Sequence, residues 1–129
     1  MGVPVEFISG KGPIFADSIC NNEKLRLNSD GALKKLEYVF EATSLIKASI
    51  DVPLIGFAGS PWTLFVYLYY GESPKNHDKL NNYLKQKSHN THSYLEQLTE
   101  ITKDYIHAQI EAGANCIQIF DSWGGFCLL

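Results

Sequence analysis

Two short segments of the sequence combine glycines, hydroxyl groups and aromatic side chains in a way that could bind or transform a small molecule. Residues 56–64 read GFAGSPWTL, and residues 120–125 read FDSWGG. Glycines let a ligand approach the backbone closely, and free N–H groups at the start of a helix attract an anion. In the second segment, Asp121 could act as a general base or could cap the following helix. For the first segment, spacing alone favours a tight strand-to-helix turn around a packed tryptophan over a ligand site.

The residue types do not favour a nucleophilic or metal-dependent site. Ser122 has no histidine beside it, because His77, His89, His92 and His107 lie in or next to polar helical stretches. A Ser-His-Asp nucleophile is therefore unsupported. Two of these histidines stand three residues apart on one helical face, but the sequence supplies no third ligand for a metal ion. We therefore expect no metal site.

Parallel strands are expected to position both segments. Apolar runs predict strands at residues 3–8, 52–58 and 115–120, and three- and four-residue spacings predict helices at 31–50, 61–70, 76–88 and 91–112. Asp30 and Ser60 stand where N-caps belong, Pro61 occupies a first helical position, and Gly113 occupies a C′ position. The order β–α–β–α–α–α–β predicts an α/β fold with about three parallel strands and crossover helices, the middle strand covered on both faces. Ligands bind at the carboxyl ends of such strands, where both segments lie.

Composition narrows the possible partners. The 129 residues are 45% hydrophobic and carry a net charge of −3, which suits a single unit over residues 1–129. Arg26 is the only arginine, so neutralisation of a phosphate backbone, and hence nucleic-acid binding, is not expected. Residues 52–71 carry no charge but are interrupted by prolines and glycines, which argues against a membrane span.

Cysteine usage and the N-terminus predict a cytoplasmic protein. Cys20, Cys116 and Cys127 make an odd number without C-x-x-C spacing, which favours reduced thiols over disulfides or a thiolate zinc site. The first residues show neither the basic start nor the apolar run of a signal peptide.

Three stretches resemble the uroporphyrinogen decarboxylase family. They are residues 53–64, residues 109–125 with their EAGA and IFDSWGG motifs, and, more weakly, GKGP at residues 10–13. The resemblance implies a (β/α)₈ TIM barrel of haem biosynthesis, of which this chain would be a middle segment. Such enzymes remove the four acetate carboxyls of uroporphyrinogen III to give coproporphyrinogen III, without metal or organic cofactor, usually as cytosolic homodimers.

The same resemblance assigns substrate-binding residues. It places Tyr67 near the substrate and the family's catalytic aspartate, Ser122 at a substrate carboxylate, and Phe57 and Phe120 as apolar walls of the macrocycle pocket. The family's catalytic aspartate, arginine-rich motif and C-terminal histidine have no counterpart in the 129 residues. We therefore expect the isolated chain to be inactive and, because three strands cannot close a barrel, to self-associate. A cobamide-dependent methyltransferase of the same fold, which binds zinc through His and Cys, and a non-catalytic α/β module are the alternatives.

Overall fold

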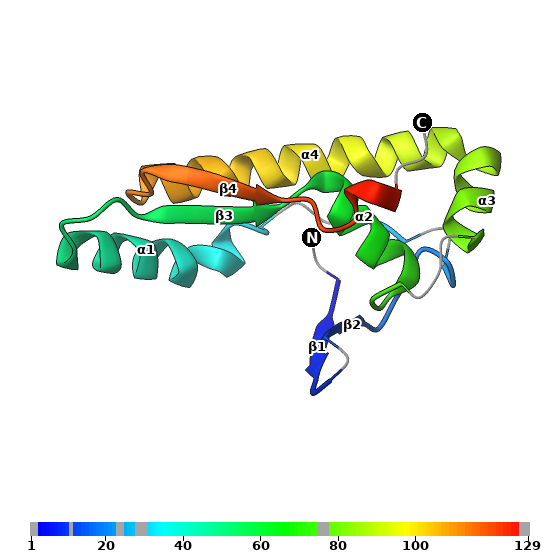
Figure 1. Cartoon of the computed structure of the whole chain (residues 1–129), viewed down its shortest axis with the longest axis horizontal. Coiled ribbons are helices and arrows are strands. Elements are labelled where there is room, and N and C mark those ends of the chain that lie inside the picture. Colours follow the sequence, from blue (N-terminus) through cyan, green and yellow to red (C-terminus); the bar gives the residue numbers. More distant parts are fainter. Residues whose placement is uncertain (1–2, 11, 23–24, 28–30, 75–77, 127–129) are drawn as a thin grey trace.

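The chain combines a β-hairpin with a parallel strand pair and four α-helices among the described residues, an α/β arrangement (Figure 1). The computed structural model describes residues 3–10, 12–22, 25–27, 31–74 and 78–126. The elements, in chain order, are β1 (Val5–Ile8), β2 (Gly12–Phe15), the 3₁₀ turn η1 (Lys34–Leu36), α1 (Glu37–Ser49), β3 (Ile55–Gly59), α2 (Pro61–Tyr70), α3 (Asp78–Gln86), α4 (Ser88–Glu111), β4 (Cys116–Phe120) and the 3₁₀ turn η2 (Gly124–Phe126).

Strands β3 and β4 form a parallel pair, joined by a connection that contains α2, α3 and α4. Their register runs from Ile55 opposite Cys116 to Gly59 opposite Phe120. The long helix α4 runs along this pair and contacts β3, β4 and α1 (Figure 1). The strands predicted at residues 52–58 and 115–120 are therefore confirmed, with their carboxyl ends at the same edge.

The prediction of about three parallel strands is wrong for the first strand. Within the described residues, β1 pairs with β2 in an antiparallel hairpin, and this hairpin forms a sheet separate from β3 and β4. Gly10 and Gly12 have φ of 78° and 76°, a conformation that glycine adopts without steric cost. These glycines let the chain reverse at once, so the first strand has a local partner instead of a crossover. In Figure 1 the hairpin projects away from the β3–β4 pair.

The expectation that β3 is covered on both faces is also wrong. Gly56 and Ala58 are buried on the side of α4, but Ile55 and Phe57 are each 61% exposed. The apolar sequence of β3 therefore reflects one covered face and one open apolar face among the described residues.

Helix α2 begins and ends as its sequence predicts. The Ser60 hydroxyl accepts a hydrogen bond from the Thr63 N–H (3.0 Å), and Pro61 occupies the first turn. Gly71, with φ of 75°, ends the helix, and its N–H donates to the Tyr67 carbonyl (2.8 Å). The uncharged residues 52–71 thus form a strand and a short helix. None of the described helices meets the length and apolarity that crossing a bilayer requires.

The other helices differ from the predicted ranges mainly at their ends. The helix predicted at residues 31–50 begins only at Glu37, after a 3₁₀ turn, and its predicted cap Asp30 lies outside the described residues. The two helices predicted at 76–88 and 91–112 are α3 and α4, separated by Lys87 alone. Gly113, with φ of 110°, follows the end of α4, which confirms its predicted C′ position.

The hydrophobic core lies where α2, α3 and α4 meet, not beneath the β3–β4 pair. Its buried members are Ile19, Phe65, Val66, Leu68, Tyr69, Leu80, Tyr83, Tyr94 and Leu98. Fully burying one such aliphatic or aromatic side chain contributes about 1.5–3 kcal/mol. The Tyr69 hydroxyl donates to the Lys79 carbonyl (3.1 Å), and burial, together with the neighbouring Cys20, raises the pKa of this phenol far above its usual value. Most aromatic residues of α2 thus serve the core.

Candidate functional site

The carboxyl ends of β3 and β4 are joined directly, which brings the two candidate segments together. The Ser60 N–H donates a hydrogen bond to the Phe120 carbonyl (2.8 Å). The Ser60 hydroxyl donates to Asp121 Oδ1 (2.5 Å). Ser60, the residue that follows β3, therefore bonds both to Phe120 at the end of β4 and to Asp121 after it.

A second hydroxyl completes this connection. Thr63 Oγ1 donates to the same Asp121 Oδ1 (2.9 Å) and accepts a hydrogen bond from the Trp123 N–H (3.2 Å). Ser60 and Thr63 are 9% and 5% exposed, so these hydroxyls have little access to water. The carboxylate also lies at the start of α2, where the helix dipole favours negative charge. Asp121 thus connects the end of β4 to the first turn of α2.

The two tryptophans form a further contact between the two segments. Trp62 Nε1 donates to the Trp123 carbonyl (2.8 Å), so the indole of the first segment holds the backbone of the second. The Gly124 N–H donates to the Asp121 carbonyl (3.1 Å), and a Cβ at Gly124 would come within 2.6 Å of Asp121 Oδ2, so a side chain there would displace this carboxylate. Hydrogen bonds therefore hold the turn that carries Ser122 at Asp121, at Trp123 and at Gly124.

Of the four predicted substrate-binding residues, Phe57 and Phe120 are in direct contact. Their ring centroids are 6.2 Å apart at an interplanar angle of 70°, an edge-to-face contact. The two residues are 61% and 52% exposed, so they form an open apolar wall, not an enclosed pocket. Below, "the phenylalanine wall" means these two residues.

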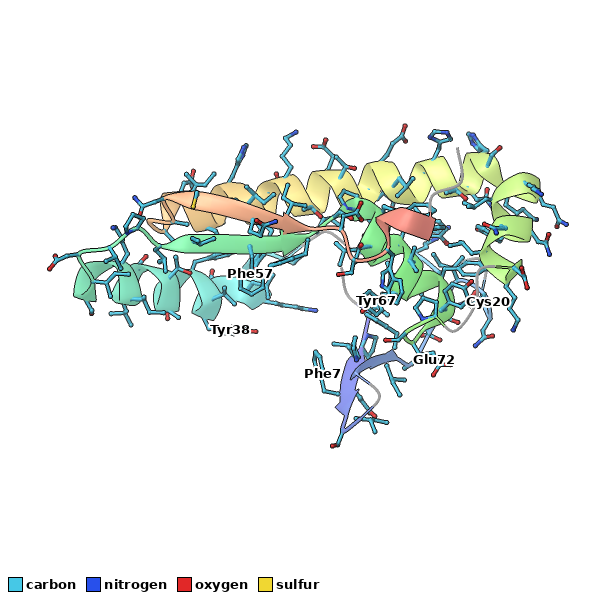
Figure 2. All side chains as sticks on the ribbon, viewed as in Figure 1. Phe7, Cys20, Tyr38, Phe57, Tyr67 and Glu72 are labelled. Atoms are coloured by element: carbon cyan, nitrogen blue, oxygen red, sulfur yellow. The ribbon has the colours of Figure 1, made fainter. Side chains whose placement is uncertain are left out.

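Ser122 lies in this fixed turn, and Tyr67 lies beside it. The ring of Tyr67, which is half-buried on α2, packs edge-on against Trp123 with centroids 5.8 Å apart. Ser122 is exposed and directly precedes Trp123. Figure 2 shows Phe57 on β3 and Tyr67 on α2, at separate places along the molecule. The four predicted residues therefore form two groups: Phe57 contacts Phe120, and Tyr67 packs against the turn that carries Ser122.

The sequence did not identify Thr63 as part of the site. Its signal was available in principle, because a hydroxyl three residues after an N-cap lies on the first turn of the helix and faces the end of the neighbouring strand. The sequence also did not predict the hydrogen bond of Trp62, because only the fold shows that its indole N–H reaches the Trp123 carbonyl.

The described residues contain no group of three His, Cys, Asp or Glu side chains placed to hold a metal ion. His89, His92 and His107 are exposed on α4, and Cys20 and Cys116 are exposed free thiols. His77 and Cys127 lie outside the described residues.

Comparison with known proteins decides the family. The sequence matches the family model described as uroporphyrinogen decarboxylase (URO-D) over residues 1–127. The chain belongs to the uroporphyrinogen decarboxylase family. Because the match includes all three stretches that resembled the family, it confirms the assignment made from the sequence.

Relatives in this family are similar over nearly the whole chain. Uroporphyrinogen decarboxylase of Campylobacter jejuni is 44% identical over 126 residues, which is 95% of the chain. The enzymes of that name from Francisella philomiragia and Francisella tularensis subsp. novicida are 43% and 41% identical over 127 residues, or 97% of the chain. The chain spans 37% of the length of each of these relatives.

Proposed function

We propose that a protein carrying this chain is a uroporphyrinogen decarboxylase, a carboxy-lyase that converts uroporphyrinogen III to coproporphyrinogen III by removing four acetate carboxyls. The observation that carries the proposal is the joining of the two family motifs at the carboxyl ends of β3 and β4 through Ser60, Thr63 and Asp121. In parallel α/β folds this is the edge where ligands bind. Identity of 40–44% to decarboxylases supports the same activity.

The architecture that accompanies this function is a (β/α)₈ barrel in which β3 and β4 are adjacent strands. Support comes from the covered and open faces of β3, since α4 packs on one side and Phe57 projects from the other. In a barrel of this type helices cover the outside and side chains of the inner face line the interior. The whole enzyme would be a cytoplasmic homodimer that uses neither metal nor organic cofactor.

The chain's own contribution is one side of the substrate site. The phenylalanine wall would contact the apolar face of the tetrapyrrole, Tyr67 would donate a hydrogen bond near the reacting pyrrole, and Ser122 would bind a carboxylate. The substrate bears eight carboxylates, and recognition of carboxylates relies on bidentate arginines. Since Arg26 is the only arginine of the chain, the arginines that bind these carboxylates would come from outside these 129 residues. The charge-stabilising aspartate would also come from outside them.

A chimera tests the proposal. Residues 1–127 of this chain would replace the matching segment of the Campylobacter jejuni enzyme, and coproporphyrinogen formation would be followed by chromatography. We expect the chimera to decarboxylate uroporphyrinogen III and the 129-residue chain alone to show no turnover above buffer. A chimera that folds and is soluble but forms no product would contradict the proposal. Zinc bound in stoichiometric amount would instead favour the methyltransferase alternative.

A further inference from the structure

Trp123 contacts α2 between the two polar residues proposed to bind substrate, Tyr67 and Ser122. Its N–H donates to Thr63 Oγ1 (3.2 Å), and its carbonyl accepts a hydrogen bond from Trp62 Nε1 (2.8 Å). Its ring meets that of Tyr67 edge to face, with centroids 5.8 Å apart at an interplanar angle of 74°. One residue of the turn after β4 therefore makes three separate contacts with α2.

The three contacts follow one side of α2. Trp62 and Thr63 are neighbours in the first turn of this helix, and Tyr67 is four residues beyond Thr63. Residues four apart lie on the same face of a helix, about one turn from each other. Trp123 therefore lies along α2 from its capped start to Tyr67.

The backbone contacts of Trp123 fix the peptide unit that it shares with Ser122. A peptide bond is planar, so a hydrogen bond to the Trp123 N–H also sets the direction of the Ser122 carbonyl. On the other side, the Asp121 carbonyl accepts a hydrogen bond from the Gly124 N–H (3.1 Å), which closes a four-residue turn around Ser122 and Trp123. The exposed Ser122 therefore stands on a backbone that is held before and after it.

The ring of Trp123 contacts a side chain for which the helix alone allows two directions. An aromatic residue on a helix adopts a χ1 of about 180° or about −60°, and the two rotamers place the ring differently. Tyr67 is half-buried, so it is not enclosed on all sides. An edge-to-face contact stabilises one arrangement of two rings over others. The contact with Trp123 therefore favours one rotamer of Tyr67, and with it one place for the hydroxyl.

We infer that Trp123 is a positioning residue, which orients Tyr67 through its ring and Ser122 through its backbone, so that both groups meet one substrate at a fixed spacing. The inference rests on the proposed function for the identity of the substrate, but not for the contacts themselves. All of these contacts join residues of this chain at the carboxyl ends of the β3–β4 pair. A closed barrel adds its further strands at the outer edges of this pair and leaves the contacts in place.

Steady-state kinetics in the chimera tests the action on Tyr67. Trp123→Leu keeps an apolar side chain but removes the ring, and it should lower kcat roughly fivefold with less than about a twofold change in KM, the pattern of an interaction made only in the transition state. In the Tyr67→Phe background, where no hydroxyl remains to be positioned, the same substitution should have no further effect on kcat. Trp123→Phe retains an aromatic ring and should restore most of the activity.

Trp62→Phe tests the action on Ser122. This variant retains an aromatic ring beside Phe65 but removes the indole N–H that holds the Trp123 carbonyl. KM should rise roughly threefold with less than about a twofold change in kcat, because a carboxylate held by Ser122 is bound alike in the ground and transition states. In the Ser122→Ala background, Trp62→Phe should leave KM unchanged.

Phe40→Leu is the matched control for the loss of a ring contact. The rings of Phe40 and Tyr105 also have centroids 5.8 Å apart, but they join α1 to α4. This variant should leave kcat and KM of the chimera at their unmodified values.

The 129-residue chain gives a readout that does not depend on activity. Three-bond couplings to the Tyr67 Hβ protons, measured by nuclear magnetic resonance, report the χ1 of this residue. We expect one rotamer in the wild type and in Trp123→Phe, and an average over two rotamers in Trp123→Leu.

The two kinds of measurement separate the possible failures. If the unmodified chimera is inactive while the Tyr67 rotamer depends on Trp123, the proposed function is wrong and the positioning by Trp123 is supported. If the chimera is active but Trp123→Leu changes neither the rotamer nor kcat, the inference is overturned and the function stands. An equal loss of kcat with and without the Tyr67 hydroxyl, or loss of the cooperative urea transition in Trp123→Leu, would also overturn it, because the effect would then be on folding as a whole.

Discussion

Replacing Asp121 with alanine is expected to destabilise the chain by about 2–3 kcal/mol. The carboxylate accepts hydrogen bonds from Ser60 (2.5 Å) and Thr63 (2.9 Å). A hydrogen bond to a charged group contributes about 1.5–3 kcal/mol. The low end applies to each bond here, because Asp121 is exposed and one of its oxygens serves both donors. The variant also leaves two buried hydroxyls without their acceptor.

Two further variants divide this cost. Asp121→Asn keeps the acceptor oxygen and removes the charge, so it should cost about 1 kcal/mol. Thr63→Val keeps the shape of the side chain but removes one donor to Asp121 and the acceptor of the Trp123 N–H. In the double variant Asp121→Ala/Thr63→Val, the loss should fall short of the sum of the single losses by about 1 kcal/mol, because the two residues share a bond.

Urea unfolding followed by tryptophan fluorescence measures these changes. Trp62 and Trp123 flank the connection and report directly on it. Unfolding would be measured at several protein concentrations, since association adds to apparent stability. Asp51→Ala, at an exposed position before β3, is the control and should change stability by less than about 0.5 kcal/mol. The reasoning is refuted if Asp121→Ala costs no more than this control or if the double variant is strictly additive.

Three other outcomes are expected. In the chimera, Tyr67→Phe should lower kcat/KM roughly tenfold to a hundredfold, as for loss of a charge-assisted hydrogen bond, and Ser122→Ala somewhat less; wild-type kinetics in both would remove their assigned roles. The 129-residue chain should self-associate in light scattering across a concentration series, because Phe57 and Phe120 leave an open apolar face, and a stable monomer at high concentration would contradict this. The pKa of Tyr69 is raised in the folded state, so the stabilising contribution of this phenol is present below about pH 10 and is lost as pH rises toward the folded-state pKa. Tyr69→Phe should therefore lose less stability at alkaline pH than the wild type does. Equal alkaline unfolding curves for the two proteins would exclude this contribution.

Local signals in the sequence predicted the elements that carry the site. Ser60 and Pro61 define the start of α2, and Gly71 defines its end, because caps and turns depend on a few neighbouring residues. The strand at residues 115–120 was also predictable from its apolar run. That both motifs lie at one edge followed from the parallel order of their strands, and the bond between Ser60 and Asp121 bears this out.

Partner choice was not predictable from the same signals. The first strand has the alternation of any half-buried strand, and only the positive φ at Gly10 and Gly12 shows that its partner is the next segment. Periodicity also could not tell whether β3 is covered on one face or two, since Ile55 and Phe57 are apolar in either case. The hairpin is a local feature whose signal was the pair of glycines at its turn, whereas the covering of β3 depends on contacts with distant residues, for which a single sequence carries no local mark.

The contrast between the two halves of the site has a consequence for how substrate would be bound. The turn with Ser122 is fixed by the Asp121 carboxylate, the Thr63 hydroxyl and the Trp62 indole, so a hydroxyl there can meet a carboxylate without first being ordered. The phenylalanine wall lies on the paired strands β3 and β4, and its two rings contact each other edge to face but remain open to solvent. Fixed polar groups discriminate between ligands, whereas an open apolar wall adds contact area with little demand on shape. On this argument, changes at the Asp121 connection should alter which tetrapyrroles are accepted, and changes at Phe57 and Phe120 should alter how tightly all of them bind.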